Sequence, residues 1–311
     1  MKTKNFFKLG ILVVALTGFT FTGCKKDKTT DPNPNTQSLQ QLSKDEVTVT
    51  QISDDALNDA NNVLSGGQNK STELWPCNAT IDSATVAGDS ITYHITYNGD
   101  NCPGNRTRTG QVSITKKIGQ HWGAPGATTT VKLINLTITK KSNGKSLTLN
   151  GTKVFTNVSG GYMWQLGTSY TNIVHKAVGS VTATFDDNST RVWNINRQRT
   201  FTGTLAGGLI LTIDGQGSAD GYDNLVVWGI NRNSEAFYTQ ITQSVVIKAA
   251  CDWNPVSGIK IHQIPSDSKK ATLTYGYDSN NQPVPIGDCA EYFKVDWQKG
   301  THSGTFFLPL P

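Results

Sequence analysis

TTVKLINLTITKKSNGKSLTLNGTKVFT, residues 129–156, is the clearest hairpin signal in the chain. On each side of Asn143-Gly144, apolar residues alternate with Thr, Lys or Asn, which is the period of a strand with one buried face. Asn and Gly both accept the positive φ angles that a tight turn requires. This stretch therefore predicts two antiparallel strands joined by a turn.

The same alternation recurs on both sides of this hairpin. It is found in residues 90–97, 111–117, 180–186, 209–214 and 237–248. No helical pattern separates these runs, and successive hairpins without helices are typical of all-β proteins. We expect an all-β fold, as an antiparallel, hairpin-rich sandwich, meander or open barrel.

One short helix is expected near the N-terminus of this region, over residues 53–66. Its apolar residues fall on one helical face: Ala56, Leu57, Ala60, Val63 and Leu64. Ser53 is placed to cap the first turn and Gly66 to end the last. We expect its apolar side to pack on the sheet.

The first 23 residues have the pattern of an export signal. Three lysines precede a hydrophobic run over residues 9–21, which is shorter than the roughly 20 apolar residues of a membrane-spanning helix. The run ends in Phe21-Thr22-Gly23-Cys24, which resembles the lipobox of bacterial lipoproteins. That resemblance implies a signal peptide over residues 1–23 and a lipid on Cys24, which anchors the mature chain to a membrane.

Residues 24–45 are polar and contain two prolines, so they are expected to form a disordered tether. The all-β region then covers residues 46–311, either as one large domain or as two related halves, about 46–175 and 176–311. Without the three lysines of the signal, 25 basic residues face 23 acidic ones, and a net charge near +2 does not favour a nucleic-acid partner.

Four further cysteines, Cys77, Cys102, Cys251 and Cys289, are an even number in an exported protein, which favours two disulfides. Three pairings are open. We prefer Cys77 with Cys102 and Cys251 with Cys289, because each pair brackets a similar strand-rich stretch. A four-cysteine zinc site is disfavoured, because the spacings contain no Cys-x-x-Cys knuckle.

Three aromatic residues are candidate ligand-binding residues. Trp122 lies in the loop Gly119–Gly126 among turn-forming residues, and Tyr162 and Trp164 follow Gly160-Gly161. Exposed rings on a β surface stack on sugars or anchor protein partners, whereas buried rings fill a core. We expect Trp122 to be the most exposed of the three.

No catalytic motif, metal-ligand spacing or cofactor fingerprint stands out, so no metal and no cofactor is expected. Four acids are available for glycoside hydrolysis: Asp223, Glu235, Glu291 and Asp296. Such chemistry needs two carboxyl groups facing one cleft, which a sequence does not place.

Three short motifs resemble those of a group of uncharacterised lipoproteins of Bacteroidetes-type bacteria. They are CPGNRTRTGQVSI at 102–114, NGTKVFTN at 150–157 and RVWNINRQR at 191–199. The resemblance implies an all-β protein lipid-anchored in the outer membrane of the cell envelope, and it brings no activity. In surface-displayed members, acidic residues are common after the lipidated cysteine, whereas this chain has Lys25-Lys26-Asp27-Lys28. The sequence therefore does not decide between the surface and the periplasmic face of the outer membrane.

Together these features predict a membrane-anchored envelope lipoprotein that binds a glycan or an envelope protein, or has a structural role. An envelope carbohydrate hydrolase is the alternative.

Overall fold

A computed structural model describes residues 36–65 and 76–310. It contains one long helix, α1 (Gln37–Ser65), and a single antiparallel sheet of 15 strands. The expectation of an all-β fold with one N-terminal helix is confirmed. Among the expected arrangements, the chain adopts a meander.

The first seven strands follow one another in sequence order across the sheet. They are β1 (Ala79–Ala87), β2 (Ser90–Asp100), β3 (Arg106–Lys117), β4 (Ala127–Lys140), β5 (Ser146–Asn157), β6 (Ile173–Phe185) and β7 (Thr190–Thr204). The hairpin predicted around Asn143-Gly144 is β4–β5, in which Thr139 pairs with Ser146. Because β6 runs across residue 175 and pairs with both neighbours, the sheet is continuous between the two halves considered above.

The remaining strands extend the sheet from β7. They are β8 (Gly208–Gly215), β9 (Gly217–Ala219), β10 (Tyr222–Ile230), β11 (Ala236–Lys248), β12 (Asn254–Ile264), β13 (Lys269–Tyr277), β14 (Tyr292–Lys299) and β15 (His302–Pro309). β7 pairs with two strands along the same side: its first half pairs with β10 and its second half with β8. β8 also pairs with the end of β11, and so fills the space between the two longer strands.

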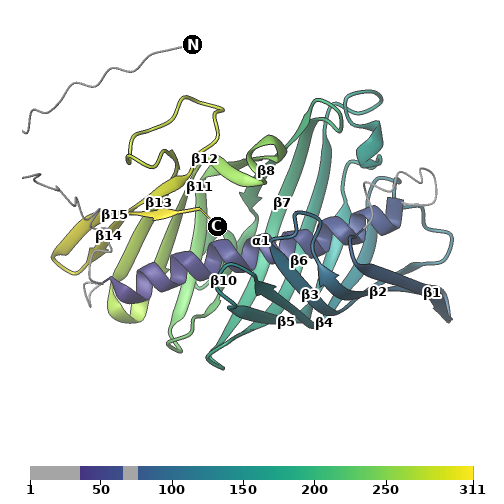
Figure 1. Cartoon of the computed structure of the whole chain (residues 1–311), viewed down its shortest axis with the longest axis horizontal. Helices are drawn as coiled ribbons and strands as arrows, with labels where there is room; N and C mark the ends of the chain where they lie inside the picture. Colours follow the sequence, from purple (N-terminus) through teal and green to yellow (C-terminus); the bar gives the residue numbers. More distant parts are fainter. Residues whose placement is uncertain (1–35, 66–75, 311) are drawn as a thin grey trace, which may run out of the picture. The chain divides into compact units, whose positions relative to one another are not determined.

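Helix α1 crosses one face of the sheet (Figure 1). β7 shows how the strands form that face, because every second residue from Arg191 to Phe201 is buried while the residues between them are half-buried or exposed. The helix buries Leu39, Leu42 and Leu57 completely or nearly so. Each such side chain contributes about 1.5–3 kcal/mol to the stability of the fold.

Helix α1 begins much earlier than the sequence indicates. Residues 37–45 are helical, so their expected disorder is wrong, while residues 1–35, which include the signal and Cys24, lie outside the described residues. Ser53 does not cap a helix: it is buried in the helix interior and its hydroxyl accepts a hydrogen bond from Lys153. Gly66 also lies outside the described residues.

Both preferred disulfides are present. Cys77 bonds to Cys102 with Cα atoms 5.2 Å apart, and Cys251 bonds to Cys289 with Cα atoms 5.3 Å apart. The first links the two outer ends of the β1–β2 hairpin. The second ties the turn after β11 to the loop before β14.

Candidate functional site

Two of the three aromatic residues singled out from the sequence form a stacked pair between β5 and β6, in which Trp164 is exposed and Tyr162 half-buried. The rings of Tyr162 and Trp164 stack almost in parallel, with centroids 5.9 Å apart and an angle of 8° between their planes. Trp164 keeps 36% of its surface accessible. Trp164 thus presents an indole to solvent while Tyr162 supports it. We call Tyr162 and Trp164 the aromatic platform.

The loop that carries Trp122 packs directly against this platform. Gly123 lies so close to Tyr162 that a Cβ atom there would be 2.5 Å from a ring carbon. The Gly161 N–H donates to the Gly123 carbonyl at 2.8 Å, and the Tyr162 N–H donates to the Gln165 side-chain oxygen at 2.9 Å. The two hydrogen bonds hold the backbone at Tyr162, and its ring packs closely on Gly123.

Asn157, at the end of β5, holds the two loops together. It is fully buried, and its Nδ2 donates to the carbonyl of Trp122 at 2.9 Å and to that of Gly161 at 2.8 Å. One side chain therefore bridges the loop of Trp122 and the loop of the aromatic platform.

Trp122 is not the exposed ring that we expected. It is only 3% exposed and packs on Phe155 and His175, with ring centroids 5.1 and 5.6 Å apart. Its Nε1–H donates to Oδ1 of Asn61 on α1 at 2.9 Å. The expectation was wrong because the loop folds over β5 and inserts the indole beneath α1. The buried indole is therefore not accessible to a ligand, and the carbonyl of Trp122 is linked to the loop of the platform through Asn157.

A second feature, not foreseen from the sequence, is a layer of ion pairs and hydrogen bonds between α1 and basic residues of the sheet and its turns, which we call the charged layer. Its main contacts are Ser38–Lys269, Asp45–Arg232, Glu46–Lys260, Ser53–Lys153, Asp54–Arg197 and Asp59–Arg108. Arg108 and Arg197 alternate with Thr, Asn or Gln along their strands, which indicates their direction. Lys260 lies between two isoleucines and Arg232 lies in a turn, and no local pattern indicates the partners on α1.

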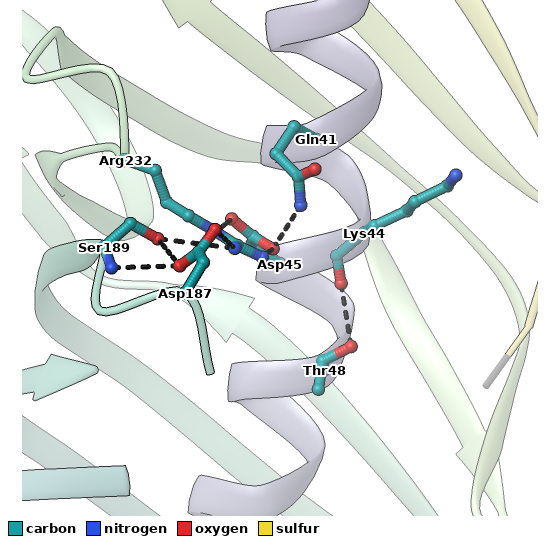
Figure 2. A network of polar contacts seen from close by, with 7 residues as sticks. All are labelled: Gln41, Lys44, Asp45, Thr48, Asp187, Ser189 and Arg232. Atoms are coloured by element: carbon teal, nitrogen blue, oxygen red, sulfur yellow. Dashed lines mark hydrogen bonds and ion pairs between the residues drawn. The ribbon is translucent and has the colours of Figure 1, made fainter. Parts of the chain in front are cut away.

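Figure 2 shows the part of the charged layer around Arg232, in the turn between β10 and β11. Its Nε and Nη2 donate to the two oxygens of Asp45 at 2.7 and 2.5 Å, a bidentate arrangement. Nη1 lies 3.3 Å from Asp187, and the guanidinium sits 3.3 Å from the centroid of the Phe185 ring. The N-terminal half of α1 is therefore fixed to two turns at the ends of central strands, the β6–β7 turn and the β10–β11 turn.

Burial and charge shift several pKa values in this layer. Burial alone would raise the pKa of Glu46, but the adjacent Lys260 ammonium and other cationic neighbours outweigh it and hold that pKa at about 2. Burial and the charge of Arg197 lower the pKa of Lys153 to about 7. Arg191 is fully buried, and within the described residues its three nitrogens have no hydrogen-bond partner, although the guanidinium lies over the Phe237 ring at 4.4 Å.

Two recesses flank α1. The larger lies between the middle of the helix and strands β8, β11, β12 and β13, and the smaller lies beside β2, β3 and β4. Asp55 lines both of them. No sequence motif pointed to these residues, because they come together only when the helix crosses the sheet.

The four acids considered for hydrolysis do not line either of these two recesses. Asp296 pairs with Lys294 at 2.9 Å and accepts a hydrogen bond from Thr305, and Glu235 accepts one from Asn231. Over residues 36–65 and 76–310, no group of three His, Cys, Asp or Glu side chains is placed to hold a metal ion. In that same part of the chain, no helix has the length and apolar character needed to cross a bilayer.

Comparison with protein-family models, with curated proteins and with solved structures yields no match to this chain.

Proposed function

We propose that the protein is an envelope lipoprotein, anchored to the outer membrane through Cys24, that binds a glycan on its aromatic platform without cleaving it. The observation that carries this proposal is the parallel Tyr162–Trp164 stack with an accessible indole. A sugar presents a face of C–H groups that packs on the π face of such a ring.

The platform is held rigidly, which supports a role in ligand binding. Tyr162 is held by Gly123, by Gln165 and, through Gly161, by the buried Asn157. A pre-positioned ring loses little conformational freedom when a ligand stacks on it, which favours affinity.

The hydrolase alternative has less support. Asp223, Glu235, Glu291 and Asp296 belong to different strands or loops and line neither of the recesses described above. A glycosidase needs two carboxyl groups on opposite sides of one bond, roughly 5 to 10 Å apart. Binding is therefore the function that we favour.

A glycan array tests the proposal, with the full-length protein in a non-ionic detergent. Wild type is expected to retain a defined subset of glycans, and Trp164→Ala should weaken that binding by about tenfold or more, because the stacking face is lost. Ile286→Ala removes an exposed apolar side chain elsewhere and should leave binding unchanged. Absence of any bound glycan, or equal binding by Trp164→Ala, would show the proposal to be wrong.

Gly123→Ala is a second variant for the same array. Its added methyl group meets the Tyr162 ring and must displace it, so glycan binding should fall although Trp164 is intact. Ala124→Val, at the exposed neighbouring position, is the matched control and should bind like wild type.

The lipid anchor is tested separately. Cys24→Ala should abolish labelling by a palmitate analogue and release the protein from the membrane fraction, since the acyl chains supply about 0.8 kcal/mol of membrane affinity per buried CH₂. Labelling that persists in Cys24→Ala would exclude this cysteine as the attachment point.

A further inference from the structure

The larger recess beside α1 has the construction of a small-molecule site. Its floor is apolar and is formed by Leu211, Ile213, Val245 and Ile247 of β8 and β11. Helix α1 forms one side, with Val47 among its lining residues. An apolar floor with a few polar groups around it is the usual composition of a ligand pocket.

The opposite wall is held in an unusual backbone conformation. Trp253 and the preceding Asp252 both have positive φ angles, 58° and 54°, which bulky residues rarely adopt. They follow directly on Cys251, which is bonded to Cys289, and the Trp253 N–H donates to the Lys248 carbonyl at 3.1 Å. Strained residues of this kind concentrate at functional sites, where the surrounding structure enforces them.

Two polar atoms of the lining residues have no partner. Within the described part of the chain, Oδ1 of Asn254 and the hydroxyl of Tyr275 are buried and make no hydrogen bond. Tyr275 is only 4% exposed. Buried polar groups are almost always paired in folded proteins, so these two call for a ligand or water with complementary groups.

The charge of the recess is negative where it is accessible. Asp55 keeps 48% of its side-chain surface exposed, and its ion pair with Arg106 is long, at 3.7 Å. Asp54 is engaged by Arg197, and both oxygens of Glu46 lie 3.1 Å from the Lys260 ammonium. Asp55 is therefore the acidic group of this recess that is least satisfied by the protein itself. Burial and the neighbouring Asp59 and Asp54 raise its pKa to about 7, so an added cation beside it would favour its ionised form.

We propose that this recess binds a small amphiphile, an apolar chain or aromatic ring that carries a primary ammonium group. Its apolar part covers the floor of Leu211, Ile213, Val245 and Ile247. Its ammonium group pairs with Asp55 and donates to Asn254, while the ring of Trp253 favours a cation beside it. This site shares no residue with the aromatic platform, so it is independent of glycan binding.

Isothermal titration of the full-length protein with 2-phenylethylamine tests the proposal. Its neutral and anionic relatives, 2-phenylethanol and 3-phenylpropanoate, have the same ring without the positive charge. The amine should bind about tenfold more tightly than the alcohol, and the carboxylate more weakly than either. Asp55→Asn should remove the advantage of the amine and leave the affinity for the alcohol unchanged.

A second pair of variants shows where the ligand lies. Val47→Trp fills the recess from α1 and should abolish binding of the amine and of the alcohol, whereas Lys44→Trp, at an exposed position on the same helix, should preserve both. Unfolding temperatures close to that of wild type establish that each variant is folded. Lack of amine binding, a preference for the carboxylate, or amine binding that persists in folded Val47→Trp would each overturn the proposal.

Discussion

Lys153 is a basic residue buried between α1 and the sheet. It is fully buried, with its ammonium donating to Ser53 and lying near the Trp193 ring, and its pKa is lowered from 10.5 to about 7 by burial and by Arg197. Burying an ion is expensive unless a partner of opposite charge compensates it. The neighbouring Asp54 is already shared by Arg197 and Arg199.

Lys153→Met is therefore expected to stabilise the protein at pH 7, by about 1–3 kcal/mol, because the apolar chain is kept and the charge is removed. Between pH 7 and pH 9 the unfolded lysine holds a proton that the folded one has lost, so the stability of wild type should rise with pH. In Lys153→Met this rise should be absent. Urea unfolding of both proteins at pH 7, 8 and 9 measures the difference.

Lys132→Met is the control, because this lysine is exposed on the neighbouring strand β4. It should unfold like wild type at each pH. A Lys153→Met variant that is less stable than wild type at pH 7 would mean that the bond to Ser53 outweighs the burial of the charge.

At the scale of the element, the strands were predictable and most of the helix was not. Each alternating run lies within an observed strand, except that the run 180–186 ends one residue beyond β6, because the period of two is set by the geometry of the chain itself. In α1, polar Glu46 and Ser53 occupy positions on the buried side, and the β-branched run from Val47 to Thr50 has low helix propensity. The helix is stabilised there by ion pairs to distant strands, which a local pattern does not contain.

The candidate sites were also predictable only in part from the sequence. Tyr162 and Trp164 were found because glycines mark their turn. Trp164 is accessible and Tyr162 is partly buried. Trp122 was misjudged because a turn-rich loop gives no sign of what it folds against. The recess beside α1 was missed because Asp55, Trp253 and Tyr275 are far apart in sequence and meet only through the crossing of the helix over the sheet.

For the whole molecule, the charged layer and its buried histidines determine how stability changes in acid. Burial lowers the pKa of both His175 and His262 to about 3, with Arg199 adding to the effect at His175. Between pH 6.5 and pH 3 these histidines are protonated in the unfolded chain and neutral in the folded one. Stability is therefore lost as the pH falls through this window. Further loss follows between pH 4.5 and pH 2, where Glu46 is protonated in the unfolded chain and still ionised in the folded one.

His175→Phe should reduce this acid sensitivity. The imidazole is surrounded by the rings of Trp122, Phe155 and Phe201, which can accommodate another aromatic ring, and its Nδ1 has no hydrogen-bond partner within the described residues. Thermal unfolding from pH 7 to pH 4 should show a smaller loss of stability than in wild type, by up to about 3 kcal/mol at pH 4. His302→Phe, at an exposed position of β15, should follow the wild-type curve. Parallel curves for His175→Phe and wild type would show that this histidine does not resist protonation in the fold, and that the acid response arises from the carboxylates of α1 instead.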